Sequence, residues 1–295
     1  MSNLTIFSVP KAFEGHTGVI QANAIQSWSR ISEDVQVLLV GDDPGVKEFA
    51  TEHSVPHIPE VKRNERGTPM LDDVFRTAFE NCQTDYMMFV NCDIVLTSSV
   101  LEFIRLIDAE NAVEDFLGIG MRVDFDQFDR IDFEADWQTE IKDKAFRDGE
   151  YASILCKDYF IFRRGQFTDI PAFSIGRGNW DSWMVSEASR RKLPIIDGTN
   201  RVFAGHQNHD YDHVGGRMSA YLSGDEARKN IELAGGRHYI KGSLATHAFG
   251  KDGKFKKVNQ FPWLTFLRDS PRLFKQLLSF WSWKSKSNAE VSSAA

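Results

Sequence analysis

Short hydrophobic runs alternate with segments of helical spacing along the first half of the chain. A short apolar run bounded by polar residues predicts a buried strand, and apolar residues three and four positions apart predict a helix. Strands that alternate with helices favour a parallel sheet joined by right-handed crossovers. The predicted strands are 4–9, 35–40, 57–59 and 84–97, and the predicted helices are 19–28, 44–52, 69–82 and 98–108.

The pattern changes in the second half, where hydrophobic segments are separated by a long polar, acidic stretch at about 124–148. The chain contains no internal repeat. We interpret it as one mixed α/β domain, a mainly parallel sheet flanked by helices, rather than as two independent domains. The segments predicted in this half are strands at 116–123, 153–162, 195–196 and 202–203 and a helix at 180–192.

The stretch 84–97 carries the first candidate site residue. Its first hydrophobic run stops at Asn91, and Asp93 follows before a second run begins. Ligands bind at the carboxyl ends of strands in open α/β sheets, so Asp93 is well placed to hold a divalent cation against a phosphate. The alternative is that Asp93 only caps the next helix, although Ser98 and Ser99 can cap that helix themselves.

A second candidate lies at the predicted start of the helix 180–192. Asp181 stands between Trp180 and Trp183. Apolar rings beside a carboxylate raise its pKa and suit it to act as a general base. Alternatively, Asp181 is a helix N-terminal carboxylate favoured by the helix dipole, and the tryptophans belong to the core. The residues alone leave both interpretations open.

Two loops complete the candidate site. The segment 10–16 follows the first strand and can hold a nucleotide base through its backbone, with Lys11 near a phosphate, although it has neither a dinucleotide fingerprint nor a Walker loop. The segment 205–213 contains three histidines and two aspartates. Such a density of ligand side chains favours contact with metal or phosphate. A polar surface loop is the alternative for any single histidine.

Composition places the chain among ordinary globular proteins. Hydrophobic residues make up 42% and charged residues 26% of the sequence, and no apolar span has the length that a bilayer requires. The three cysteines show neither zinc nor disulfide spacing. The N-terminus has no secretory signal pattern. We therefore expect a cytoplasmic protein in a reducing compartment.

Charge divides the chain into an acidic body and a basic tail. The net charge is −7, yet 251–286 holds nine lysines and arginines against two aspartates. An acidic body argues against nucleic-acid binding. In the tail, a helix is predicted from Ser270, and the tryptophans and lysines of 263–284 suit peripheral contact with the inner face of the membrane. The alternative is a helix that packs on its own domain.

These motifs converge on a known family. The first half resembles the nucleotide-sugar-binding half of GT-A-type glycosyltransferases, and Asn91-Cys92-Asp93 resembles their Asp-x-Asp motif. The similarity covers about 5–247 and is greatest to a bacterial and plant group of nucleotide-diphospho-sugar transferases. The segments that carry it are PKAFEGHTGVIQANAIQSW, VNCDIVL, KDYFIF, IPAFSIGRGNWDSWMV, HQNHDYDHVGG and GDEARKNIELAGG.

The resemblance implies an activity and a division of the chain. A glycosyltransferase domain would span 1–250, with its nucleotide-binding half at about 1–110 and its acceptor half at about 111–250, and the tail would span 251–295. The donor would be a nucleotide-diphospho-sugar, with UDP favoured over GDP, and the cofactor Mn²⁺ or Mg²⁺. A hydroxyl of a glycan or of a lipid-linked acceptor would receive the sugar.

The resemblance also assigns roles to residues. Asp93 would bind the cation, with His206 or His209 as a further ligand, and Asp181 would deprotonate the acceptor in an inverting, single-displacement reaction. Lys11 would help to neutralise the departing diphosphate. The donor is expected to contact Pro10, Lys11, Asp42, Asp43, Asn91 and Asp93, and the further substrate contacts are expected from Asp158, Tyr159, Arg177 and Trp180.

One position departs from the family pattern. The first carboxylate of Asp-x-Asp is replaced by Asn91, which can still hydrogen-bond a ribose, whereas Asp93 keeps the main metal-ligand position. Two other functions therefore stay open. A metal-dependent phosphohydrolase could be built on the His/Asp cluster, and Asn91 suggests a non-catalytic nucleotide- or glycan-binding protein.

Overall fold

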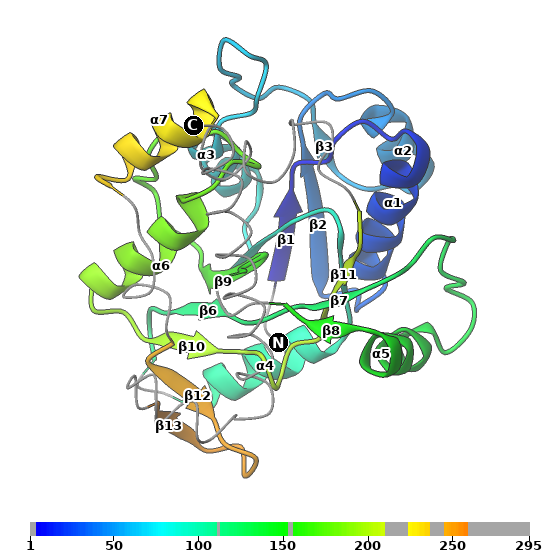
Figure 1. Cartoon of the computed structure of the whole chain (residues 1–295). Helices are drawn as coiled ribbons and strands as arrows, with labels where there is room; N and C mark the ends of the chain where they lie inside the picture. Colours follow the sequence, from blue (N-terminus) through cyan, green and yellow to red (C-terminus); the bar gives the residue numbers. More distant parts are fainter. Residues whose placement is uncertain (1–3, 111–112, 153–155, 210–223, 237–244, 259–295) are drawn as a thin grey trace, which may run out of the picture.

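The computed structural model describes residues 4–110, 113–152, 156–209, 224–236 and 245–258. The predicted helix after Ser270, the remainder of the tail and the last residues of the histidine cluster lie outside this part of the chain. Within it, helices cover both faces of a large twisted sheet (Figure 1). None of the helices described is long and apolar enough to cross a membrane.

The large sheet is mainly parallel, as the alternating pattern predicts. Strands β1, β2, β3 and β4 pair in parallel, whereas β9 runs antiparallel to both β4 and β6. Among the described residues the sheet has nine strands in the order β13-β12-β10-β6-β9-β4-β1-β2-β3. Their bounds are β1 Leu4–Ser8, β2 Val35–Val40, β3 His57–Ile58, β4 Tyr86–Val90, β6 Leu117–Ile119, β9 Tyr159–Arg163, β10 Ile195–Asp197, β12 His247–Phe249 and β13 Phe255–Lys257.

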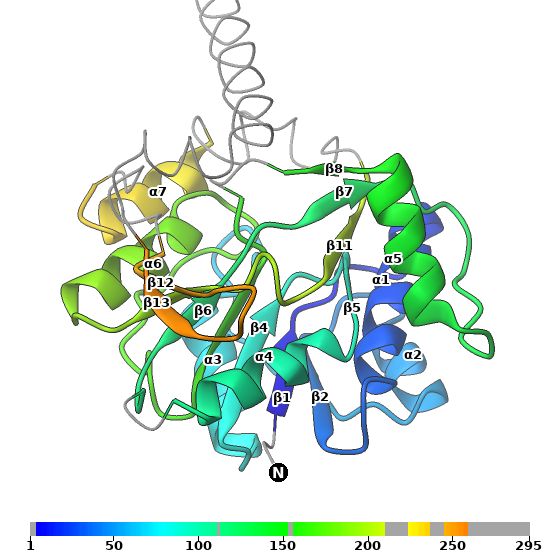
Figure 2. The ribbon, with the colours of Figure 1, turned by 90° about the horizontal axis from the view of Figure 1, so that it is seen from below.

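A smaller sheet stands against the carboxyl end of β4. It contains β5 (Ile94–Leu96), β11 (Ala204–Gln207), β7 (Val123–Phe125) and β8 (Glu150–Tyr151), in that order. Figure 2 shows β7, β8 and β11 together above the larger sheet. Its first strand is the second half of the predicted strand 84–97, which the chain breaks at residues 91–93.

The small sheet overturns three boundaries expected from the sequence. The segment 84–97 forms two strands in different sheets, and so does 116–123, which divides into β6 and β7. The strand expected at 202–203 is β11, and it begins at Ala204. In each case the hydrophobic run predicts burial correctly. In the first two cases, however, hydrophobicity alone does not report the turn of the backbone between two sheets.

The helices form layers on either side of the large sheet. The core on one face includes residues of α1, α2 and α4, and the core on the other includes residues of α3 and α6. Leu71, Val74 and Phe75 give α3 the apolar face expected from their spacing. The helix bounds are α1 Gly15–Ser29, α2 Val46–Glu52, α3 Leu71–Asn81, α4 Ser99–Asp108, α5 Trp137–Asp148, α6 Trp180–Arg190 and α7 Asp225–Leu233.

Helix α5 was not expected from the sequence. It lies inside the acidic stretch 124–148 and buries only Trp137, Ile141 and Ala145. These residues are four positions apart, so they form one stripe along the helix. The stripe packs against Val123 and Phe125 of the small sheet in a separate hydrophobic cluster. The sequence pattern did not indicate this helix because its apolar stripe is narrow and most of its other residues are charged or polar.

Helix α1 holds the junction between the two sheets. Trp28 is fully buried, and its indole Nε1 donates a hydrogen bond of 2.8 Å to the carbonyl oxygen of Ile94. The hydroxyl of Ser27 accepts a hydrogen bond of 3.1 Å from the backbone N–H of Leu96. Both contacts fix β5 directly after Asp93. The position of Asp93 is therefore set by α1 as well as by β4.

Candidate functional site

Asp93 lies beside two histidines at the carboxyl end of β4. In the antiparallel pair β5–β11, His206 stands opposite Ile94, which brings its ring next to Asp93. The distance from Oδ2 of Asp93 is 3.0 Å to Nε2 of His209 and 3.6 Å to Nε2 of His206. One ligand atom from each residue lies within 4.8 Å of the others. The pairing of β5 with β11 thus brings Asp93 together with two histidines that are distant from it in sequence.

The donor atoms of this cluster fit a divalent cation. Oδ1 of Asp93 is buried and accepts no hydrogen bond from the residues that the structure describes. A buried oxygen without a partner is costly, and a bound cation would supply the missing partner. Carboxylate oxygen suits Mg²⁺ and Mn²⁺, whereas imidazole nitrogen suits transition metals. The mixed set therefore fits a divalent cation.

The cluster is strongly polarised. Burial acts to raise the pKa of Asp93, but the charges and hydrogen bonds of His206 and His209 hold that pKa well below its usual range. For His206, burial acts to lower the pKa, and the carboxylates of Asp93 and Asp124 outweigh burial and raise the pKa to about 9. The raised pKa favours the protonated form of His206 when no cation is bound. A metal ion would take the place of that proton.

Two residues that the sequence did not single out orient the cluster. Asp124 of β7 stands opposite His206 in the parallel pair β7–β11, and its Oδ1 lies 2.9 Å from Nδ1 of His206. The buried Arg122 donates from Nε to Asp124 over 2.7 Å. A carboxylate behind a ligating imidazole fixes the orientation of its ring. The signal in the sequence was a charged pair, Arg122 and Asp124, around a buried valine.

Asn91 has a structural reason to be an amide. Its Nδ2 donates to Oδ1 of Asp158 over 3.0 Å, and its backbone N–H donates to the carbonyl of Asp158 over 3.0 Å. The same Oδ1 accepts from Arg122 over 2.6 Å. A carboxylate at position 91 would face that of Asp158. The buried Oδ2 of Asp158 accepts no hydrogen bond within the described residues, so Asp158 brings a second carboxylate to the site.

Asp181 occupies the first turn of α6, near this second carboxylate. Burial raises its pKa, the positive charge of Lys157 opposes that rise, and the charge of Asp158 adds to it. These interactions place Asp181, Lys157 and Asp158 in one electrostatic neighbourhood. Its backbone hydrogen bonds, to its own N–H and to that of Ser182, act to lower the pKa. Burial outweighs the opposing interactions, so the pKa of Asp181 lies above the usual value for an aspartate.

The two predicted donor loops lie at the carboxyl ends of β1 and β2. Gln21 of α1 clamps Lys11, because its Oε1 accepts from the Lys11 N–H over 2.6 Å and its Nε2 donates to the Lys11 carbonyl over 3.0 Å. Asp42 and Asp43 both bind Arg63, over 2.6 and 2.8 Å. The hydrogen bond from Arg63 lowers the pKa of Asp42. Pro10 is buried next to Lys11.

Two residues that were expected to contact substrate are buried in the structure, and those contacts stay predictions. Tyr159 is fully buried, and its hydroxyl lies against Gly120 and Gly198. The ring of Trp180 packs on Phe89 and Phe160, with ring centroids 5.4 and 5.3 Å away. Aromatic residues next to charged motifs look like binding residues in sequence, but their large apolar area places these two in the core.

Arg177 has a partner within the protein. Its Nε donates to Oε2 of Glu226 in α7 over 2.7 Å, and Oε1 of Glu226 accepts from Asn64 over 2.6 Å. Arg177 therefore links the loop before α6 to α7. Its expected contact with substrate stays a prediction.

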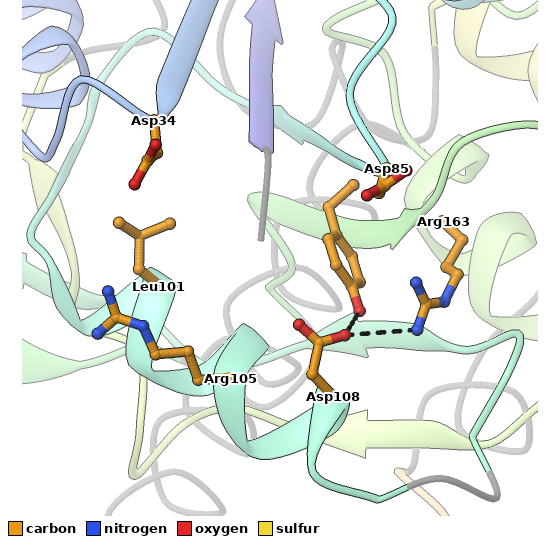
Figure 3. A pocket seen from close by; sticks show the side chains of 7 residues that line it. Asp34, Asp85, Leu101, Arg105, Asp108 and Arg163 are labelled. Atoms are coloured by element: carbon orange, nitrogen blue, oxygen red, sulfur yellow. Dashed lines mark hydrogen bonds and ion pairs between the residues drawn. The ribbon is translucent and has the colours of Figure 1, made fainter. Parts of the chain in front are cut away.

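A cavity of about 260 Å³ lies at the opposite edge of the sheet and is distinct from the candidate site (Figure 3). Asp34 precedes β2 and Asp85 precedes β4, so the cavity is at the amino ends of these strands. Within it, the Tyr86 hydroxyl binds Asp108, and the guanidinium of Arg163 lies 4.6 Å from the centre of the Tyr86 ring. Leu101 and Arg105 complete the lining. These contacts join β4, β9 and α4.

Solved structures provide a comparison for the whole fold. The structure of S. aureus TarS 1-349 in complex with UDP-GlcNAc superposes with a TM-score of 0.51 at 12% identity, over 79% of this chain and 65% of that one. The fold is of the GT-A type. Glucosyl-3-phosphoglycerate synthase from Mycobacterium tuberculosis, in complex with Mn²⁺, UDP and glucosyl-3-phosphoglycerate, gives 0.46 at 13% identity, over 87% of each chain.

A nucleotide-diphospho-sugar transferase from Desulfovibrio desulfuricans G20 is a third structural neighbour. Its TM-score is 0.43 at 14% identity, over 79% of this chain and 97% of that one. The match to the TarS structure covers about two thirds of the TarS chain. No protein-family model matches the sequence, and no curated protein matches it with significant similarity.

Proposed function

We propose that this protein is a metal-dependent glycosyltransferase that moves a sugar from a nucleotide-diphospho-sugar to a hydroxyl group. The observation that carries the proposal is the meeting of Asp93, His206 and His209 at the carboxyl end of a central strand in a GT-A-type fold. Ligands bind at that edge of open α/β sheets. Because the TarS structure holds UDP-GlcNAc, a UDP-sugar is the favoured donor and a GDP-sugar the second choice.

We propose Mn²⁺ as the cofactor, held by Asp93, His206 and His209, with Mg²⁺ as the weaker alternative. A cation at this position would neutralise the negative charge of the leaving diphosphate. Asp124 would keep the imidazole of His206 directed at the cation through the contact at Nδ1. Asp158 would supply the second carboxylate that Asn91 lacks, either to the cation through water or to the donor ribose.

The remaining roles fall to the surrounding loops. Lys11 would place a positive charge near the diphosphate. Burial raises the pKa of the neighbouring Cys92 thiol, and the charge of Lys11 opposes that rise. Asp181 would accept the proton of the attacking hydroxyl in a single displacement, which inverts the anomeric centre. Burial supports this role because it raises the pKa of Asp181 and makes the carboxylate a stronger base.

The proposal is tested by thermal unfolding with UDP or GDP, each with Mn²⁺, with Mg²⁺ or with a chelator. Preferential binding to the folded state raises the melting temperature. We expect UDP with Mn²⁺ to give the largest rise, and Asp93→Asn to abolish the part that depends on metal. The matched control is Asp34→Asn at the opposite edge of the sheet, which should respond as the parent does.

Turnover separates the proposed reaction from its alternatives. Incubation with UDP-sugars and a panel of glycan acceptors should release UDP with transfer of the sugar. Hydrolysis of simple phosphoesters without any acceptor would favour a phosphohydrolase. Binding of UDP without turnover on any donor would favour a nucleotide-binding protein. A parent protein that is stabilised by neither nucleotide, with or without metal, would contradict the proposal.

A further inference from the structure

Phe128 is an exposed aromatic residue beside the candidate site. It lies in the loop between β7 and α5, and 66% of its surface is exposed. Among the described residues, the other large hydrophobic side chains that are exposed are Phe146, at 54%, and Leu233, at 39%. A single exposed apolar residue is ordinary. Phe128 differs because of what holds its loop and what the loop adjoins.

The loop that presents Phe128 is held by buried polar side chains. Nδ2 of the fully buried Asn23 donates to the carbonyl of Asp129 over 2.9 Å, and its Oδ1 accepts from the N–H of Ile131 over 3.0 Å. The buried Gln127 also donates to the Asp129 carbonyl over 2.8 Å, and its Oε1 accepts from Lys144 over 2.7 Å. The backbone around Phe128 is thus fixed before any ligand arrives, and a ligand would pay little ordering entropy.

Asn208 connects the loop to the candidate metal ligands. Asn208 donates from Nδ2 to Oδ1 of Asp126 over 2.9 Å, and its carbonyl lies 3.3 Å from Nε2 of His16. The rings of His16 and Phe128 are 5.7 Å apart. Asn208 is followed in the chain by His209, which contacts Asp93. Phe128 is therefore linked to the candidate site by the ring of His16 and by Asp126, both of which contact Asn208.

The chemistry around Phe128 selects the kind of ligand. An aromatic face carries partial negative charge, so the polarised C–H groups of a sugar ring stack on it favourably. Exposed Asp126 and Asp129 flank Phe128 in sequence and offer acceptors for hydroxyl groups. The loop 126–132 has three aspartates against one arginine, Arg130, so its charge disfavours phosphates and anionic lipid surfaces.

We propose that Phe128 is the stacking platform of the acceptor subsite and receives a neutral pyranose ring. This inference rests on the proposed function, because it names the class of acceptor for the same site. Asp126 and Asp129 accept hydrogen bonds from the ring hydroxyls. Phe128 binds the acceptor and takes no part in binding the donor or the metal.

The test measures binding of methyl α- and β-pyranosides of glucose, galactose, mannose and N-acetylglucosamine by isothermal titration calorimetry, with UDP and Mn²⁺ present. At least one pyranoside should bind the parent protein, and Phe128→Ala should weaken that binding by about tenfold. Phe128→Trp should retain it. Phe146→Ala is the matched control, an exposed phenylalanine on α5, and it should leave binding unchanged.

Two results would overturn the inference. One is a parent protein that binds none of these pyranosides, and the other is a Phe128→Ala variant that binds as the parent does. Stabilisation by UDP and Mn²⁺ is measured on the same samples. If that stabilisation is present while Phe128 proves irrelevant, the acceptor inference fails and the proposed function stands. If it is absent from the parent protein, the proposed function fails.

Discussion

At the scale of one residue, Asp181 is the carboxylate whose proposed role as a base would cost stability. Burial raises the pKa of Asp181, so the folded protein favours its protonated form. An acid with a raised pKa contributes stability below its unfolded pKa, and loses that contribution as the pH rises through its folded value. At neutral pH the ionised carboxylate therefore destabilises the fold.

Asp181→Asn should raise the melting temperature at neutral pH while abolishing sugar transfer. The amide has nearly the same shape and carries no charge, so the cost of burying a charge disappears. The gain in melting temperature should shrink as the pH falls, because the parent carboxyl then becomes protonated as well. Calorimetry of both proteins across acidic to neutral pH measures this. The base role is wrong if the variant binds UDP and Mn²⁺ normally and transfers sugar at the parent rate.

The junction between β4 and β5 positions the candidate metal ligands at the scale of elements. The backbone leaves the large sheet after Val90, passes Asp93 and enters the small sheet at Ile94. The N–H of Gln207 donates to the Asp93 carbonyl over 3.1 Å and ties β11 to the same junction. Helix α1 holds the far side through Trp28. The β4–β5 junction, β11 and α1 together thus determine the position of the Asp93 carboxylate.

Trp28→Phe should destabilise the protein by about 2 kcal/mol, because it leaves the buried carbonyl of Ile94 without its donor and removes buried volume. Urea unfolding measures the loss. Affinity for Mn²⁺ should fall as well, since β5 then loses a restraint beside Asp93. Trp137→Phe on α5 is the control for affinity. It changes a buried tryptophan of another hydrophobic cluster and leaves the hydrogen bond from Trp28 to Ile94 intact. Equal stability of parent and Trp28→Phe would contradict the role of α1.

The distribution of charge belongs to the scale of the whole molecule. The body of the chain is acidic, and the basic, tryptophan-rich segment lies at 251–286. The acidic loop at Phe128 and the basic tail call for different partners, a neutral sugar and an anionic surface. The proposal of a lipid-linked or membrane-attached acceptor rests on this tail.

The full-length protein should sediment with vesicles that contain anionic lipid, and much less with neutral vesicles. Added salt should release it, because the attraction is electrostatic and is screened. Lys284→Glu together with Lys286→Glu should weaken sedimentation, whereas Lys47→Glu together with Lys229→Glu, in α2 and α7 of the domain, should leave it unchanged. Failure to bind anionic vesicles at low salt would remove the membrane proposal.

The sequence by itself determined which segments are buried, because apolar periodicity reports local burial directly. Strands β1, β2 and β4, helix α3 and the parallel order of the first half were predictable for this reason. Asp93 and Asp181 were also found from sequence, because each is a carboxylate at the end of a predicted element. Asp93 follows the hydrophobic run of β4, and Asp181 lies at the start of α6. Their catalytic roles stay predictions.

Only the tertiary structure decided which distant side chains meet. His206 reaches Asp93 because β11 pairs with β5, and Asp124 reaches His206 because β7 pairs with β11. Strand pairing depends on contacts between residues far apart in the chain, and no local pattern encodes it. For the same reason the sequence could not show why position 91 is an asparagine, since its amide donates to Asp158, which is distant in the chain. Nor could it show that Tyr159 and Trp180 are buried in the core.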